Sequence, residues 1–398
     1  MSASDLTTVA FVVKRKYQDG PVADLATRDH PFLQEISKSG GFTGSALFYP
    51  IKGAHPQGIA GTFDDAKEGA SSSKGKQLQA NRKKKYLVIT IDGEAIAACE
   101  SDGAFVDLVR QELDGGIEEM GDNLAFDVVR DGSGMRGRRA SISGNIVTLE
   151  TPDDARNFKE GMTVVASNND PTGASLRSGS TTIASIDEDN GKVTLTNAAA
   201  ISSFSDNDYL FRKGDPGTCM EGLAVCTPLT APASGDSFRG VDRSTNVRAY
   251  AGVRVNDTSS SIEENIGLAA VKNSQGGRKV TRHWLNPINF WQVARRLNAK
   301  VEYTGGGGEA DFGFQYISVH TPAGIVKVVA DADFPTNRGY GGNPASHYIK
   351  HLRGFPHIVM DDGLKSLRQT DDDGIEVRGR SWSNYIQRAP GDFHVIAI

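Results

Sequence analysis

The sequence has little cysteine, no long apolar run and no strong excess of either charge. Of its 398 residues only three are cysteines, Cys99, Cys219 and Cys226, and no two of them form a CxxC pair. Such a small odd number does not build a disulfide framework, so we expect reduced thiols in a protein made in the cytosol. The N-terminus lacks the basic region and apolar run of a secretory signal.

Membrane and nucleic-acid partners find little support in the composition. No apolar run approaches the roughly 20 residues that span a bilayer, so no membrane partner is expected. The net charge of −5 is mild, whereas general binders of nucleic acids or anionic membranes are basic. Apolar residues make up only 38% of the chain and glycine 45 positions, above its usual share of about 7%. Much of the chain is therefore expected to be loop, turn or extended arm.

Motifs of enzymes and metal sites are also missing. Gly305 to Gly308 lacks the Lys-Ser/Thr pair of a phosphate-binding loop. His347 and His351 could share a helix face, but no Glu follows the first of them as in hydrolytic zinc motifs, which favours a surface histidine pair. The run from Asp371 to Asp373 fails the calcium-loop pattern, because Arg380 stands where a bidentate Glu is required. We therefore predict no catalytic residue, metal or cofactor.

The strongest periodic signal lies between Ser101 and Asp131. Its apolar residues recur at gaps of three and four and predict one narrow stripe along a long helix: Val106, Val109, Leu113, Ile117, Met120, Leu124 and Val128. Either an ordinary core helix or a strut crossed by a sheet would show this pattern. Gly115 and Gly116 fall in mid-helix, where each costs about 1 kcal/mol relative to Ala, so a bend or a close backbone neighbour is expected there.

The chain before this helix predicts extended structure. Residues 1 to about 38 have scattered apolar positions without the mass for a core, which indicates an arm lying on another surface. The stretches Phe42–Ile51 and Tyr86–Ile91 both resemble strands, with a low-complexity tip at 69–76 between them, and together predict a long two-stranded excursion. The basic cluster from Arg82 to Lys85 is either a solvated charge run or a contact with an acidic neighbour.

The chain after the helix divides into two kinds of sequence. Between Arg139 and Asp215 short strands alternate with turns, the clearest at Asn190-Gly191, and predict a small β-barrel or sandwich inserted in the fold, with a short helix near Pro152–Phe158. From about Gly217 a mixed domain follows. It includes a helix opened by Ser260-Ser261, another opened by Asn286-Pro287, and closing strands at 325–329, 375–379 and 394–398.

The order of these parts resembles a tailed-bacteriophage major capsid protein of the Hong Kong 97 type, an α+β fold. The matching stretches are an arm, a long loop, Ile91–Ile96, the long helix, Thr321–Asp331 with Phe334-Pro335, Glu376–Arg378, Tyr385 and Ala389–Gly391. The resemblance implies an N-terminal arm (1–39), an extended loop (40–93), a peripheral domain with a spine helix (94–138), the inserted β domain (139–215), an axial domain (216–320) and a return through the peripheral sheet (321–398).

The resemblance also implies the protein's role and partners. It predicts a shell subunit that assembles with itself into pentamers and hexamers, encloses double-stranded DNA without reading its sequence, and works with portal, scaffolding or decoration proteins. The shell would form in the bacterial host cytoplasm and become the virion capsid. Contacts between subunits are expected from residues of the loop and the helix: Phe42, Phe48, Tyr49, Arg82, Lys83, Lys84, Lys85, Tyr86, Glu118 and Glu119.

Three other interpretations remain open at the level of sequence. An encapsulin-type nanocompartment shares the fold but encloses enzymes. A metal- or sugar-dependent enzyme would use His347, His351 and the Asp361-Asp362 region. A secreted adhesin-like β protein is disfavoured by the missing signal segment and the odd cysteine count.

Overall fold

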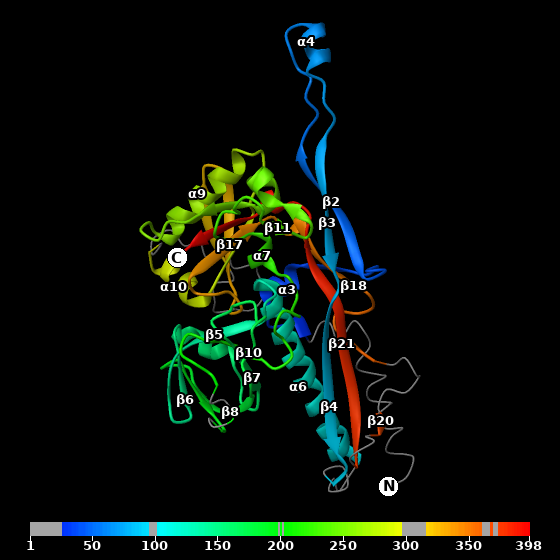
Figure 1. Cartoon of the computed structure of the whole chain (residues 1–398), viewed down its shortest axis with the longest axis vertical. Coiled ribbons are helices and arrows are strands. Elements are labelled where there is room, and N and C mark those ends of the chain that lie inside the picture. Colours follow the sequence, from blue (N-terminus) through cyan, green and yellow to red (C-terminus); the bar gives the residue numbers. More distant parts are fainter. Residues whose placement is uncertain are drawn as a thin grey trace, which may run out of the picture. The chain divides into compact units, whose positions relative to one another are not determined.

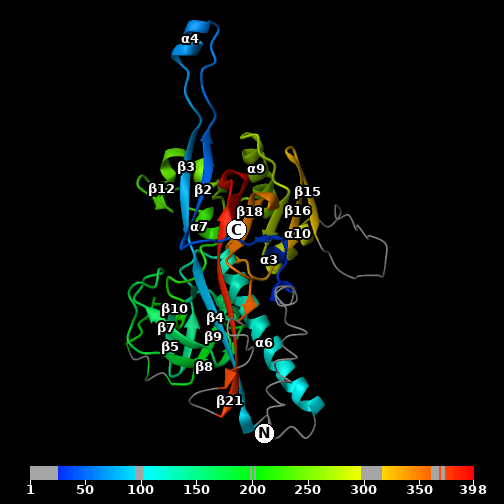
Figure 2. The same ribbon diagram turned by 90° about the vertical axis from the view of Figure 1, so that its right-hand side faces the viewer.

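A computed structural model describes residues 26–94, 102–197, 200, 203–296, 316–359, 367–368 and 373–398. The chain divides into two compact units, one of residues 1–129 and 226–398 and the other of residues 130–225. The first unit contains two six-stranded sheets and a two-stranded hairpin, and the second is built around a closed barrel. Figures 1 and 2 show these elements from two directions.

The first sheet, here called the long sheet, is organised around its longest strand, β21. Its members are β1 (Ser37–Ser39), β4 (Lys83–Asp92), β18 (His347–His351), β19 (His357–Ile358), β20 (Leu367–Arg368) and β21 (Gly374–Gln387). Strand β4 runs antiparallel to β21 along its whole length, from the pair of Asp92 with Gly374 to the pair of Lys83 with Ser383. The closing strand expected at 375–379 is therefore much longer than its sequence pattern indicated.

Helix α6 (Asp102–Val129) is the predicted long helix and packs against β4. The predicted stripe is confirmed over the part of the helix whose side chains are described, because its apolar residues there are all buried: Leu113, Ile117, Met120, Leu124 and Val128. Charge also joins the two elements, since Lys85 Nζ lies 3.2 Å from the buried carboxylate of Asp127. The helix is therefore the backing of the long sheet.

Glycines on α6 permit close approaches of other segments. A Cβ at Gly116 would lie 2.5 Å from Ile89 Cδ1, so the expected close neighbour exists, although it is a side chain. A Cβ at Gly115 would meet nothing within 4 Å. Gly121, which the sequence did not single out, has the carbonyl oxygen of Ala26 only 2.2 Å from its ideal Cβ position. The tightest backbone contact therefore falls one turn beyond the predicted pair.

Gly115 and Gly121 provide a matched pair of substitutions on one helix. Gly115→Ala is expected to raise the free energy of unfolding by about 1 kcal/mol, because an exposed helical position gains propensity without a clash. Gly121→Ala is expected to lower it by roughly 1–3 kcal/mol, because the new methyl group must displace the backbone of Ala26. Urea denaturation of both variants measures the difference, and two changes of the same sign would contradict the assigned packing.

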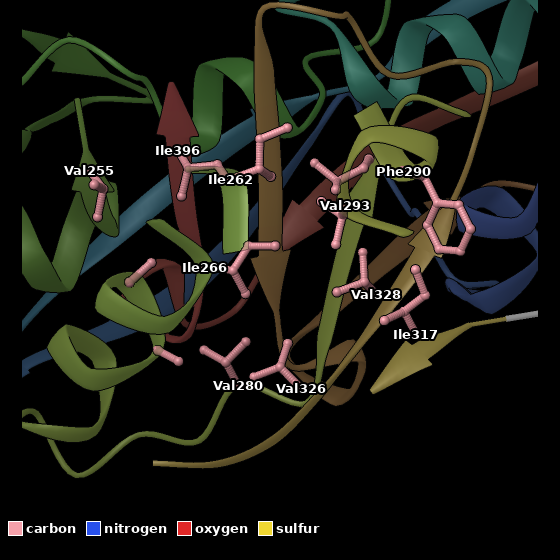
Figure 3. Close-up of a cluster of buried hydrophobic side chains, with 13 residues drawn as sticks. Val255, Ile262, Ile266, Val280, Phe290, Val293, Ile317, Val326, Val328 and Ile396 are labelled. Carbon is pink, nitrogen blue, oxygen red and sulfur yellow. The ribbon is translucent and has the colours of Figure 1, made fainter. Parts of the chain in front are cut away.

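The second sheet, here called the C-terminal sheet, has the strand order β13-β22-β17-β14-β16-β15. The strands are β13 (Val253–Val255), β14 (Arg282–Leu285), β15 (Ile317–Thr321), β16 (Gly324–Ala330), β17 (Arg338–Gly342) and β22 (His394–Ala397). Helices α9 (Ile262–Ser274) and α10 (Pro287–Arg296) bury their apolar faces against it, and Figure 3 shows this core. Both predicted helix starts are confirmed: Ser261 and Glu264 form a capping box, and the Asn286 side chain accepts from Ile288 N at 3.0 Å.

A row of histidine, glycine and histidine crosses the middle of the C-terminal sheet. His283 of β14 pairs with Gly341 of β17, which in turn pairs with His394 of β22. The two fully buried imidazoles meet over the glycine, with His283 Nδ1 3.0 Å from His394 Nε2. A Cβ at Gly341 would lie 2.4 Å from the His394 ring, so only glycine leaves room for the pair.

Residues 26–42, here called the N-terminal strap, are integrated in the first unit. They contain α3 (Pro31–Glu35) and β1, which pairs in parallel with β18. Phe32 is buried against Trp284 and Phe334, with ring centroids 4.9 and 5.2 Å apart. As expected, this part of the sequence has no core of its own and lies on another surface, which is the core of the same chain. Residues 1–25 lie outside the described part.

The second unit confirms the predicted small β domain. Its closed barrel has the order β10-β5-β6-β9-β8-β7, formed by β5 (Met135–Ser143), β6 (Ile146–Leu149), β7 (Thr163–Ser167), β8 (Thr181–Asp187), β9 (Lys192–Leu195) and β10 (Tyr209–Arg212). The Asn190-Gly191 turn joins β8 to β9, and η1 (Pro152–Asn157) is the predicted short helix. The unit is wider than the expected range 139–215 at both ends.

Several further elements of the chain are short. They are α7 (Leu223–Cys226), β11 (Ser237–Phe238), β12 (Val241–Asp242), η3 (Arg243–Asn246), α8 (Val247–Ala251), η4 (Pro344–Ser346) and η5 (Pro390–Asp392). Cys219 and Cys226 are buried free thiols, as expected, and Cys99 lies outside the described residues.

Candidate assembly surface

An extended hairpin is the most prominent exposed feature of the first unit. It consists of β2 (Ala46–Ala54) and β3 (Lys74–Asn81), with α4 (Phe63–Glu68) between them. Figures 1 and 2 show it projecting beyond both sheets of its unit, with α4 at the far end. The predicted excursion therefore exists, but its returning strand is β3. Tyr86–Ile91 belongs instead to β4 of the long sheet, and the low-complexity stretch 69–76 runs into β3 rather than forming the tip.

The base of the hairpin is fixed to its own chain. Tyr49, Ile51, Leu78 and Ala80 are buried in a cluster completed by Val241, Ala249, Tyr250 and Ile386. The Tyr49 hydroxyl accepts from Arg239 Nη1 at 2.7 Å, and burial raises the pKa of Tyr49 to about 12. Asn246 Nδ2 donates to Gly53 O at 3.0 Å. These contacts anchor the hairpin as far as residue 53.

Beyond this anchor the hairpin exposes apolar side chains. Ile59 is 96% exposed and Phe63 is 81% exposed. Thr62 caps α4 by accepting from Asp65 N at 3.3 Å, so the tip has local order despite burying no residue of its helix. Exposed apolar residues beside charged ones are typical of a protein-binding surface. The monomer itself leaves these two side chains in contact with water. Neither residue is among the contacts predicted from the sequence.

The long sheet exposes a second surface with apolar and basic residues. It lies on β4, the strand that follows the hairpin in sequence. Lys84, Tyr86 and Val88 of β4 are exposed and alternate with residues that face α6. The Tyr86 hydroxyl accepts from Trp382 Nε1 at 3.3 Å, and the Arg380 guanidinium stacks 4.2 Å from the Trp382 ring centre. This face presents aromatic side chains, which are enriched in protein interfaces, beside the exposed Lys84.

The predicted subunit-contact residues fall into three groups by exposure. Phe48, Lys84, Tyr86 and Glu118 are exposed, whereas Arg82, Lys83, Lys85 and Glu119 are half-buried. Phe42 and Tyr49 are buried within the chain, so the expectation that they contact a neighbouring subunit is corrected. Both lie under segments distant in sequence, which local pattern cannot reveal.

Several of these charges already have partners in the same chain. Glu118 accepts from Arg28 Nη2 at 3.3 Å, and Glu119 accepts from Asn123 Nδ2 at 2.9 Å. Arg82 Nη1 donates to Phe42 O at 3.4 Å. The acidic neighbour of Lys85 is Asp127 of α6, as described above. For Lys85, the acidic neighbour expected of the basic cluster therefore lies within the same chain.

The alternative of a metal site at the histidines loses its geometric basis. His347 and His351 lie on strand β18, not on a helix, and His347 is buried with Nδ1 3.0 Å from the Tyr385 hydroxyl. Neither the helical face nor the surface pair predicted for them is correct. Among the described residues no group of three or more His, Cys, Asp or Glu side chains is placed to hold a metal ion. Gly305–Gly308, Asp361-Asp362 and Asp371-Asp372 lie outside the described residues.

Comparison with known proteins identifies the fold. No protein-family model matches the chain, and no curated protein matches its sequence. Among solved structures, a chain of the cyanophage A-1(L) capsid asymmetric unit matches with a TM-score of 0.52 and 10% identity over 92% of each chain. The capsid of a native GTA particle matches with a TM-score of 0.47 and 6% identity, over 94% of this chain and 90% of that one.

An encapsulin complex from Synechococcus elongatus gives a TM-score of 0.46 and 7% identity, over 93% of this chain and 88% of that one. The fold assignment rests on the cyanophage likeness. The chain therefore has a mixed α+β fold shared with a phage capsid protein. No helix in the described part of the chain is long and apolar enough to span a membrane.

Proposed function

We propose that this chain is the major capsid protein of a tailed double-stranded DNA phage, a structural protein rather than an enzyme. The observation that carries the proposal is the fold shared with the cyanophage capsid chain over 92% of both chains. In this proposal α6 is the spine helix of a peripheral domain, the C-terminal sheet belongs to the axial domain, and the barrel unit is an insertion. The β2–β3 hairpin is the extended loop.

The hairpin supports a role in self-assembly. Its base is anchored, so the tip is held away from its own unit rather than collapsing onto it, and Ile59 and Phe63 remain in water. Burying one such side chain in a neighbouring subunit contributes roughly 2 kcal/mol. Repetition of this contact under closed symmetry would stabilise pentamers and hexamers of an icosahedral shell. The exposed residues Phe48, Lys84 and Tyr86 are proposed as further contacts.

Electron microscopy of the purified protein, with and without its companion gene products, tests the proposal. The wild type is expected to form closed, thin-walled particles. The double variant Ile59→Ser with Phe63→Ser is expected to raise the concentration needed for assembly by at least tenfold, because both apolar contacts are lost. Asp64→Ser, a polar position on the same short helix, is the matched control and should assemble like the wild type.

Two different outcomes would contradict the proposed tip contact and the proposed shell function. Normal shells from the double variant would remove the tip from the assembly surface, while leaving the shell function intact. Failure to recover particles under any condition, companions included, would overturn the shell function itself.

The contents of the particles decide between a capsid and an encapsulin-type compartment. Packaged DNA, held by counterions rather than by base contacts, is expected of the capsid. A co-purifying enzyme in place of DNA would favour the encapsulin alternative. Portal, scaffolding and decoration proteins are the further partners that the proposal implies, and the virion capsid is the proposed location.

A further inference from the structure

The N-terminal strap connects the elements of the first unit. At one end the backbone of Ala26 crosses α6 at Gly121. In its middle, Phe32 N donates to the buried carboxylate of Asp331, just after β16, at 2.8 Å. Glu35 then accepts from Arg282 Nε at 2.7 Å and from Trp284 Nε1 at 3.1 Å, both on β14 of the C-terminal sheet. The strap thus ties the spine helix to the C-terminal sheet.

His30 is the point where the strap is held from both sides. Its Nδ1 lies 2.7 Å from Asp333 Oδ2, and its Nε2 lies 3.1 Å from Asp122 Oδ1 on α6. The imidazole is only 13% exposed. A neutral imidazole has one N–H, so it could donate to one carboxylate and would turn a lone pair toward the other. The imidazolium donates to both, so the site fits the charged form.

The surroundings of His30 are acidic on every packed element. Helix α6 presents Glu118 as well as Asp122, and the segment after β16 presents Asp331 beside Asp333. The strap itself contributes Asp29 and Arg28, and Arg28 is paired with Glu118. Burial opposes the charged ring, but the hydrogen bonds and charges of Asp122 and Asp333 outweigh it and raise the pKa of His30 to about 10. A cation is therefore retained there at neutral pH.

We propose that the N-terminal strap opens and closes as a conformational switch. Its latch is the imidazolium of His30, held between Asp122 and Asp333. Closed, the latch fixes α6 relative to the C-terminal sheet of the same chain. Opening the strap frees the ring to its ordinary pKa near 6.5, so above this pH opening releases one proton. The closed state is therefore fully favoured below about pH 6.5, and it weakens as the pH rises towards about 10. The device acts within one chain and does not depend on the proposed shell function.

Protease cleavage within residues 26–42 measures the opening of the latch. Subtilisin cleaves the full chain between pH 8 and 9.5, and its rate is divided by its rate on a free peptide of the same sequence at the same pH. Asp331, with a pKa raised to about 7 by burial and by Asp333, is already ionised in this range. The corrected rate for the wild type is expected to rise about tenfold per pH unit.

Two substitutions by glutamine provide a matched comparison on the same strap. His30→Gln removes the titrating ring, so its corrected rate should be higher than wild type at pH 8 and should lose the rise of about tenfold per pH unit. Arg28→Gln removes the exposed pair with Glu118 but keeps the titrating ring, so its absolute rate can differ from the wild type while its rise with pH should be the same. A flat wild-type rate, or the same slope in His30→Gln, would overturn the proposal. If His30→Gln does not fold, Asp333→Asn takes its place, and an unchanged wild-type slope in that variant would also overturn it.

Discussion

Acidification from pH 6 to pH 4.5 is expected to lower the free energy of unfolding of the first unit by about 4 kcal/mol. The cause is a set of three buried imidazoles. Burial lowers the pKa of His347 and His394 to about 3, and burial together with the charge of His394 holds that of His283 well below its ordinary value. These rings are neutral in the folded chain and become protonated only when it unfolds.

The sign follows from the protons bound in each state. Below about pH 6.5 the unfolded chain binds three protons on these rings that the folded chain does not, so stability falls as the pH falls. Asp331 acts in the opposite direction, because its raised pKa of about 7 keeps a proton in the folded chain that the unfolded chain loses. Two net protons correspond to about 3 kcal/mol per pH unit. The loss is a large share of a typical domain's stability.

Urea denaturation at several pH values between 4.5 and 7 measures this slope. His347→Phe keeps an aromatic ring in the buried cluster but removes one titrating group, so the slope should fall to about half. His55→Phe, at an exposed position after β2, is the control and should retain the full slope. A free energy of unfolding that stays constant down to pH 4.5 would contradict the buried neutral state of the three rings.

Phe32→Ala is expected to cost about 3–5 kcal/mol of stability, the largest effect of any single substitution considered. The ring is fully buried where the strap meets the C-terminal sheet, and its neighbours are Trp284, Phe334 and His347. Its removal leaves a cavity lined by these rigid aromatic rings, which relax poorly. Urea or thermal denaturation measures the loss.

Phe48→Ala is the matched control for this substitution. The same change of residue type on β2 removes a ring that is 57% exposed, so a cost below about 1 kcal/mol is expected. Similar losses for the two variants would mean that the strap does not complete the core in the way described.

Local features of the fold could be predicted from the sequence. The stripe of α6, the cap at Ser261 and the Asn190-Gly191 turn are each encoded within a few residues, and the structure contains all three. The partner of a strand is not encoded in this way. Tyr86–Ile91 resembles any strand of a hairpin, and only its burial against α6 and its pairing with β21 place it in the long sheet.

The candidate assembly surface was harder to predict for the same reason. Ile59 and Phe63 are lone apolar residues in a polar stretch, and their significance depends on the hairpin that holds them in water. Phe42 and Tyr49 are aromatic residues of a strand-like stretch, but both are buried within the chain. Phe42 N donates to His351 O, and Tyr49 lies in the cluster at the hairpin base beside Arg239. Exposure is a property of the tertiary structure, which a single sequence pattern does not contain.

The pairing of β4 with β21 also has a consequence for the order in which the chain folds. Register partners such as Asp92 and Gly374 are separated by most of the sequence, whereas every strand of the barrel finds its neighbours between residues 135 and 212. Loop-closure entropy makes distant pairings slow, so the barrel is expected to fold first and the long sheet last. Until β21 is synthesised, Ile89 and Ile91 of β4 lack the strand beside them, and the nascent chain carries an unpaired apolar edge that favours aggregation.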